Sequence, residues 1–257
     1  DVDLPQALRQ AQELGYAEAD PTNDVEGTDA AYKLAILSSL AFHTYVPPDA
    51  VYREGIMRLT ARDFRYAKEL GYAVKLLALA KADDGTVQVR VHPALVPQDA
   101  ILANVDGVFN AVQVEADLVG RVLFYGRGAG SLPTTSAVLA DLIELAQDLY
   151  RGAPIRPPFL VAGGRPLKPM DDIATRYYVR MSVADRAGVL AQIAQVLGDH
   201  QISIASVIQK EVDEAAQTAE IVIMTHLSRE HAAQAALRAL AGLSVVTEIG
   251  NVIRVEG

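Results

Sequence analysis

Cysteine and tryptophan are both absent from the 257 residues of this chain. Without cysteine, the chain can form no disulfide, no thiolate nucleophile and no cysteine-bound zinc site. Histidine is scarce, and the five residues of this type are His43, His92, His200, His226 and His231. None of them follows the His-Glu-x-x-His pattern or another close ligand spacing. We therefore expect no metal site.

Long apolar runs and clusters of basic residues are also missing. The formal net charge is −9, from 32 acidic and 23 basic side chains. This balance argues against nucleic acid or an acidic membrane as a partner. No apolar run approaches the roughly 20 residues that span a bilayer, and no basic start followed by an apolar segment opens the chain. We expect a cytoplasmic protein, and small charged metabolites remain as candidate partners.

Proline and glycine gather in one part of the chain and indicate where it divides. Five of the 12 prolines lie within residues 151–174, together with the pair Gly163-Gly164. Such a composition is typical of a linker or of an arm draped over a neighbouring surface. A chain of this length, 51% hydrophobic and 21% charged, can bury two cores. We expect a first domain over residues 1–150, a linker over 151–174 and a second domain over 175–257.

Periodicity and turn residues predict an α+β first domain. Thr28 and Thr60 are the expected N-caps of two helices, and Asp83-Asp84-Gly85 predicts a hairpin turn. Helices are predicted over residues 4–14, 29–42, 61–70 and 133–150, and strands over 72–80, 86–91, 109–115 and 120–125. A mixed or antiparallel sheet with helices on one face fits this order best.

The second domain follows the order strand, helix, strand, strand, helix, strand. The strands are predicted over residues 177–183, 202–210, 219–227 and 245–255, and the helices over 187–197 and 228–240. This βαββαβ order is the ferredoxin-like plan. The plan by itself indicates no function.

A carboxylate-rich stretch at residues 15–33 leads into the second helix. Asp29 and Lys33 are four residues apart and share one helix face. The simpler interpretation is a surface ion pair that contributes about 0.3–0.5 kcal/mol. The helix around Lys33 is nearly all apolar, however, and Glu18 and Asp24 lie on the loop before it. A lysine among carboxylates at the edge of a core can donate a proton, and spare carboxylates can bind a substrate ammonium.

The same stretch has the pattern G-Y-x-E-x-D-P-x-x-D-x-x-G-x-D-x-x-x-K, which closely resembles the substrate-side signature of homoserine dehydrogenases. These enzymes interconvert aspartate 4-semialdehyde and L-homoserine on the route to threonine, methionine and isoleucine. The resemblance implies that Lys33 is the proton donor and that Asp29 lies beside it in the same pocket. It also implies that Glu18 binds the amino acid and that Asp24 lines this pocket.

A glycine-rich turn, G-R-G-A-G-S-L-P-T at residues 126–134, joins a predicted strand to a predicted helix. One interpretation is a tight turn that needs positive φ. The other is bare backbone and a helix N-terminus that approach a ligand closely. The turn resembles the homoserine dehydrogenase segment that closes over the nicotinamide end of NADP or NAD. The resemblance implies contacts with the cofactor from Gly130 and Gly128.

No strand followed by G-x-G-x-x-G and a helix is present, as a dinucleotide-binding (Rossmann) domain would need. Homoserine dehydrogenases carry that domain before the signature. We therefore expect this chain to be the C-terminal part of a longer enzyme and to be inactive in isolation. The resemblance further implies a second catalytic lysine from the Rossmann domain and a homodimer or homotetramer.

In the second domain, residues 185–190 (D-R-A-G-V-L) and 200–204 (H-Q-I-S-I) closely resemble the ACT domain, a regulatory module of amino-acid biosynthetic enzymes. The resemblance implies an effector site at Asp185, Gly188, Val189 and Gln201, with L-threonine as the effector. Two departures are Ala187, where such domains usually carry proline, and Gln201, where asparagine is common. The alternative is a purely structural dimerisation module.

A second function from another class also fits the sequence. The chain as it stands could be a dimeric regulatory unit that senses an amino acid and has no catalytic activity. This hypothesis rests on two features of the sequence: the chain has no Rossmann pattern, and it has a complete ACT-like module.

Overall fold

The computed structural model describes residues 3–128, 130–153, 164–213 and 215–257. The first part of the chain contains α1 (Leu4–Glu13), α2 (Thr22–Val25), α3 (Thr28–Phe42), η1 (Pro48–Ala50), β1 (Tyr52–Arg53), α4 (Ala61–Glu69), β2 (Tyr72–Asp83), β3 (Thr86–Pro97), η2 (Ile101–Asn104), β4 (Phe109–Ala116), β5 (Gly120–Arg127) and α5 (Ser131–Arg151). The second part contains η3 (Met170–Asp172), β6 (Ala174–Ala184), α6 (Val189–Asp199), β7 (Ile204–Asp213), β8 (Thr218–Thr225), β9 (Ser228–Arg229), α7 (Glu230–Ala241) and β10 (Val246–Val255). The expected α+β class is confirmed.

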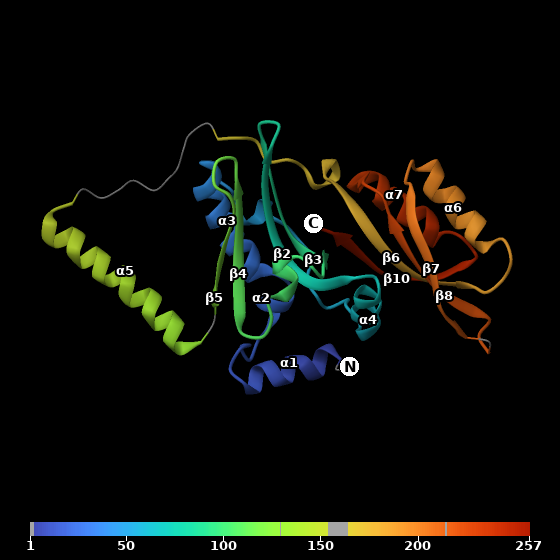
Figure 1. The fold of residues 1–257 in the computed structure, drawn as a ribbon, viewed down its shortest axis with the longest axis horizontal. Helices are drawn as coiled ribbons and strands as arrows, with labels where there is room; N and C mark the ends of the chain where they lie inside the picture. The colour runs from blue at the N-terminus through green and yellow to red at the C-terminus, as the bar shows by residue number, and fades with distance from the viewer. Residues whose placement is uncertain (1–2, 129, 154–163, 214) are drawn as a thin grey trace.

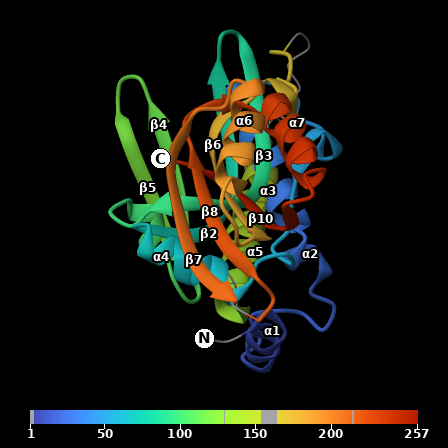
Figure 2. The ribbon, with the colours of Figure 1, turned by 90° about the vertical axis from the view of Figure 1, so that its right-hand side faces the viewer.

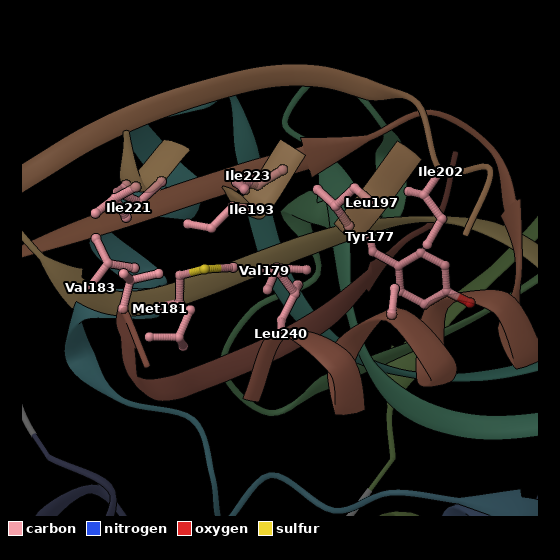
Figure 3. Close-up of a cluster of buried hydrophobic side chains, with 14 of the residues drawn as sticks. Tyr177, Val179, Met181, Val183, Ile193, Leu197, Ile202, Ile221, Ile223 and Leu240 are labelled. Carbon is pink, nitrogen blue, oxygen red and sulfur yellow. The ribbon is translucent and has the colours of Figure 1, made fainter. Parts of the chain in front are cut away.

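The C-terminal module, residues 174–255, has the predicted ferredoxin-like order. Its four long strands are antiparallel neighbours in the order β10-β6-β8-β7. Helices α6 and α7 lie side by side on one face of this sheet (Figure 2). Alternate side chains of the strands point to them, and Figure 3 shows Met181 of β6 and Ile193 of α6 in the resulting apolar core.

Helix α4 covers the opposite face of the C-terminal sheet, although it belongs to the first part of the chain. Tyr66 and Ala67 of α4 pack with Tyr178 of β6 and Val222 of β8. Thr60 caps α4 as predicted, in a capping box with Asp63. The two central strands of the C-terminal sheet, β6 and β8, are therefore largely buried on both faces within one chain.

Strand β3 joins the two parts of the chain into one sheet. One edge of β3 pairs along its length with β2, through a tight turn whose Asp84 and Gly85 both have positive φ. Its other edge pairs in parallel first with β1 and then with β10, where Leu95 lies opposite Val255. The strand predicted over 86–91 continues to Pro97, because these neighbours satisfy its backbone on both edges.

Helix α3 packs on the β2–β3 hairpin through its buried face. Ala31 and Leu34 contact a cluster that includes Val89 and Val91 of β3. The expected N-cap was wrong by one residue: Gly27, with φ 73°, is the cap, and Thr28 is already helical. The left-handed conformation lets the chain turn from the short helix α2, which the sequence did not predict, directly into α3.

Helix α5 and the β4–β5 hairpin project from the rest of the molecule. Figure 1 shows α5 standing apart at the left. Among the residues that the structure describes, none in α5 is buried. The exposed apolar side chains of α5 are Leu132, Val138, Leu139, Leu142, Ile143, Leu145, Leu149 and Tyr150. The hairpin likewise exposes Phe109, Val112, Val114, Phe124 and Tyr125. So many exposed apolar side chains on two neighbouring elements of the chain are typical of an interaction site.

The division of the chain at residues 150 and 174 stays a prediction. Within the predicted linker, residues 154–163 lie outside the described residues. The segment that follows lies along the start of β3, where the amide of Val87 donates to Pro166 O at 2.9 Å and that of Lys168 donates to Val87 O at 2.8 Å. Across the described ranges, no helix is long and apolar enough to cross a membrane.

Candidate functional site

The predicted catalytic pair lies on α3, one turn from its start. Lys33 Nζ and Asp29 Oδ2 are 2.5 Å apart. Their side chains are 68% and 46% exposed, so Lys33 does not lie at the edge of a core as its apolar neighbours in the sequence indicated. The reason is that the apolar side chains of α3 are divided between two faces. Lys33 shares its uncovered face with Ile36, Leu37 and Leu40.

The loop before α3 presents the other two predicted substrate carboxylates. Glu18 and Asp24 are both exposed. The side chain of Gln12, at the end of α1, donates a hydrogen bond to the backbone oxygen of Glu18 at 2.9 Å. This bond fixes the loop, and the carboxylate of Glu18 takes no part in it. Asp20 has a structural role: it accepts hydrogen bonds from the amide and hydroxyl of Thr22, which lower the pKa of its carboxyl.

The glycine turn meets the beginning of the signature stretch. A shallow pocket of about 560 Å³ is lined by Gly15 on one side and by the start of α5 on the other. On the α5 side the lining consists of its N-cap Gly130 and of Ser131, Thr134, Thr135, Val138 and Leu139. Two stretches more than a hundred residues apart therefore form one concave surface, which the sequence did not predict.

Backbone geometry explains why glycine occupies this turn. Gly130 has φ 117° and ψ 157°, a region that only glycine enters without strain. A Cβ at Gly128 would lie 1.8 Å from Asn110 Nδ2. The turn thus places bare backbone, a helix N-terminus and hydroxyl groups at the pocket, a set that suits a polar or anionic ligand group.

The predicted effector residues do not form one site within this chain. Gly188, with φ 87°, caps the start of α6, and Val189 behind it is buried. Asp185 is exposed, and its amide donates to Gln217 O at 2.9 Å. Gln201 lies beyond the other end of α6, about 16 Å from Gly188 along an 11-residue helix. A single small ligand could touch both only if a second copy contributed one of them.

A larger pocket, of about 780 Å³, lies between the two parts of the chain. Its walls include Tyr52 and Glu54 from the first part and Glu230 and Arg254 from the second. Arg254 Nη2 lies 2.5 Å from Glu230 Oε1, and Arg254 Nη1 lies 2.9 Å from Glu54 Oε1. Burial, together with the hydrogen bond to Glu54, raises the pKa of Tyr52 to about 12.

Sequence reasoning missed this second cluster, because its residues come from three segments far apart in the chain, namely β1 with the loop after it, α7 and β10, and follow no motif. Burial alone would raise the pKa of Glu230, but the hydrogen bond and charge of Arg254 outweigh it and hold that pKa below its usual value. Within the described ranges, no group of three His, Asp or Glu side chains could hold a metal ion.

Comparison with known proteins gives two family matches. Residues 1–143 match the model of the homoserine dehydrogenase family, and residues 177–244 match the model of the ACT domain. The chain is 46% identical over 254 residues to homoserine dehydrogenase of Neisseria gonorrhoeae, covering 97% of this chain and 58% of that protein. It is 48% identical over 264 residues to homoserine dehydrogenase of Mycobacterium tuberculosis, covering 100% of this chain and 60% of that protein.

Solved structures give the same result. A crystal structure of a homoserine dehydrogenase from Thiobacillus denitrificans superimposes with a TM-score of 0.90 at 42% identity, covering 99% of this chain and 59% of that one. A Staphylococcus aureus homoserine dehydrogenase at pH 6.0 superimposes with a TM-score of 0.71 at 32% identity, covering 100% of this chain and 60% of that one. The chain thus spans about three-fifths of the length of these relatives.

Proposed function

The chain belongs to the homoserine dehydrogenase family, and from this premise we propose that it forms the substrate-binding and regulatory part of an enzyme that interconverts aspartate 4-semialdehyde and L-homoserine. NADP or NAD is the proposed cofactor. The observation that carries the proposal is the Asp29–Lys33 pair on the exposed face of α3, directly after the loop with Glu18 and Asp24.

Lys33 is the proposed proton donor for the carbonyl oxygen of the semialdehyde. Its ammonium is accessible, and Asp29 at 2.5 Å holds it in one orientation. Proton transfer by a side chain placed in this way typically contributes about 10²–10⁴-fold to the rate. In the reverse direction, the same group removes the proton from the hydroxyl of L-homoserine.

Glu18 and Asp24 are the proposed ligands of the substrate ammonium. Both carboxylates are exposed on the loop that precedes the catalytic helix, so a substrate can reach them. A charge-assisted hydrogen bond from an ammonium would align the substrate and would disfavour simple aldehydes that lack this group.

The glycine turn is the proposed contact with the cofactor. Bare backbone at Gly130 and the hydroxyl groups at the start of α5 fit the polar end of a dinucleotide, and Gly128 is the second proposed contact. The nicotinamide, when bound, supplies the hydride that reaches C4 of the semialdehyde. The uncovered apolar faces of α5 and α3 fit a dinucleotide-binding domain, which would close this side of the pocket and exclude water.

Regulation by an amino acid is the proposed role of the C-terminal module. The sequence similarity to ACT domains and the confirmed βαββαβ order support it. L-Threonine is the proposed effector, at Asp185, Gly188 and Val189 of one copy and Gln201 of a second copy in a homodimer or homotetramer. We propose the cytoplasm as its location.

The second candidate is an amino-acid sensor without catalytic activity. The observation in its favour is the position of the C-terminal module, which shares a sheet and a core with the first part and would transmit a signal whether or not chemistry occurs.

The test is NADPH oxidation with aspartate 4-semialdehyde, for the complete enzyme and for the 257-residue chain, with and without L-threonine. We expect turnover by the complete enzyme only, suppressed by L-threonine. Turnover unaffected by L-threonine would remove the regulatory proposal. No turnover by the complete enzyme with either NADPH or NADH would favour the sensor.

A further inference from the structure

The loop at residues 54–59 links the central sheet to the loop that carries the substrate carboxylates. The amide of Glu54 donates to Val91 O of β3 at 2.8 Å, and the amide of Ile56 donates to Val25 O of α2 at 2.8 Å. Two consecutive backbone hydrogen bonds therefore connect β3 to the residue after Asp24.

Close packing makes this link stiff. A Cβ added to Gly55 would lie 2.4 Å from Val25 O and 2.7 Å from the Cα of Glu26. Gly27, the N-cap of α3, packs against the same loop, since its Cβ would lie 3.6 Å from Glu54 O. A shift of the 54–56 backbone must therefore move the end of α2 and the start of α3, because no space separates them.

The side chain of Glu54 connects this loop to the C-terminal module. Its Oε1 accepts from Arg254 Nη1 of β10 at 2.9 Å and also from the hydroxyl of Tyr52. Arg254 is only 4% exposed and is held from the other side by Glu230 at the start of α7. Glu230, Arg254 and Glu54 thus form a continuous series of charged contacts from α7 to the loop.

We propose that Glu54 is a positioning residue: its ion pair with Arg254 ties the C-terminal module to the 54–56 backbone and so sets the place of Asp24 and of the start of α3. The expected effect of Glu54 on catalysis rests on the proposed function. The contacts that link Glu54 to Arg254 and to the 54–56 backbone do not depend on that function. The inference also assigns a route by which a change in α7 or β10 reaches the substrate loop.

Stability and positioning can be separated at this residue. Glu54 is 36% exposed, so loss of its charge costs less folding free energy than loss of a fully buried one. Arg254 keeps Glu230 as a partner when Glu54 is neutral. The variant Glu54→Gln therefore folds, but its loop loses the charge that holds it to β10.

The experiment compares Glu54→Gln with Glu69→Gln in the complete enzyme. Glu69 is the matched control, because it is 49% exposed, lies in the first part and pairs with Lys210 of the C-terminal module. It belongs to α4 and not to the loop at residues 54–59, whose Ile56 amide donates to Val25 O. Amide hydrogen exchange is measured over residues 22–33 and at Ile56, together with kcat and KM.

For Glu54→Gln we expect exchange at these amides to rise about tenfold and KM for the semialdehyde to rise about tenfold, with kcat within about twofold. A purely structural loss would lower the active fraction, and thus kcat, without changing KM. Glu69→Gln should leave exchange and KM unchanged. Unchanged exchange in Glu54→Gln, or an equal rise in Glu69→Gln, would overturn the proposal.

The variant Gly55→Ala tests the same link between the 54–56 backbone and Val25 by a change in packing. Its added Cβ must displace Val25 O, so we expect the same rise in exchange and in KM without any change of charge. Unchanged exchange over residues 22–33 in this variant would also overturn the proposal. An inactive wild-type enzyme would remove the proposed function, while the exchange measurement would still decide whether Glu54 positions the loop.

Discussion

At the scale of single residues, the Asp29–Lys33 pair contributes little to the stability of the fold. The side chain of Lys33 is exposed, that of Asp29 is half-buried, and the two lie on one helix face. Such a pair contributes about 0.3–0.5 kcal/mol, so stability is a weak reason for a lysine on this otherwise apolar face. The proposed role of the pair, in which Asp29 orients the ammonium of Lys33, does not require such stability.

We predict that Lys33→Ala lowers turnover of the complete enzyme by more than about tenfold, because the proton donor is lost. The melting temperature should stay within about 2 °C, because the pair contributes so little to folding. Steady-state kinetics and thermal unfolding check the two parts. Lys68→Ala, an exposed lysine in the last turn of α4, is the control and should retain turnover. Normal turnover in Lys33→Ala would remove this residue from the mechanism.

At the scale of elements, α5 is rich in apolar side chains, as helices packed in a core are, but these side chains are exposed. Eight of its large apolar side chains are exposed, and among the described residues none in α5 is buried. Helices gain most of their stability in proteins from packing an apolar face. We therefore expect α5 to be ordered by another domain or copy, with the Gly130 turn setting its direction.

The two ends of α5 provide a matched pair of glycine substitutions. Gly130 has φ 117° and lines the pocket, whereas Gly152 at the other end has φ 64° and is the C-cap. We predict that Gly130→Ala raises KM for NADPH at least about fivefold, because an alanine there carries about 1–3 kcal/mol of backbone strain that moves the turn. Gly152→Ala should alter only stability. Equal KM values for NADPH in both variants would mean that the turn does not contact the cofactor.

At the scale of the whole molecule, buried ion pairs connect the two parts of the chain. Arg180 of β6 lies 2.7 Å from Asp63 of α4 and 3.0 Å from Glu220 of β8. Arg90 of β3 lies 2.5 Å from Glu256. Burial alone would raise the pKa of Asp63, but hydrogen bonds from Arg180 and Asn251 outweigh it and lower that pKa. Removal of one partner would leave the other buried and unpaired, which typically costs about 3–5 kcal/mol.

His92 lies beside these charges and gives the fold a pH dependence. It is fully buried, with Nε2 accepting from Arg90 Nε at 3.1 Å and Nδ1 at 2.9 Å from Pro93 O. Burial and the nearby Arg254 lower its pKa to about 4 from 6.5. Because the folded pKa lies below the unfolded one, stability is fully present above pH 6.5 and is lost as the pH falls towards 4.

We predict that protonation of His92 alone lowers the unfolding free energy of the chain by about 3 kcal/mol between pH 7 and pH 4, measured by urea unfolding at a series of pH values. The paired carboxylates add to the loss only nearer and below their unfolded pKa values, 3.8 for Asp63 and 4.5 for Glu220, so the slope above pH 5 belongs to His92. His92→Gln should be less stable at pH 7 and should lack that slope. The exposed His226→Gln should behave as wild type, and a slope retained in His92→Gln would contradict the assignment.

Local patterns determined most of the secondary structure and the family. The βαββαβ order, the Thr60 cap and the Asp84-Gly85 turn depend on residues close together in the chain, so sequence alone predicts them. The signature over residues 15–33 is equally local. It predicted that Asp29 and Lys33 lie together, because they are one helical turn apart.

Only the tertiary structure decided which surfaces meet. Lys33 is exposed because α3 turns its other face to β3, which no local pattern reports. The single sheet through β3 and β10, the pocket between Gly15 and Gly130 and the series Glu230–Arg254–Glu54 join residues distant in sequence. Such contacts form because packing and charge compensation in a shared interior are properties of the whole fold, and they carry no spacing that a sequence pattern could record.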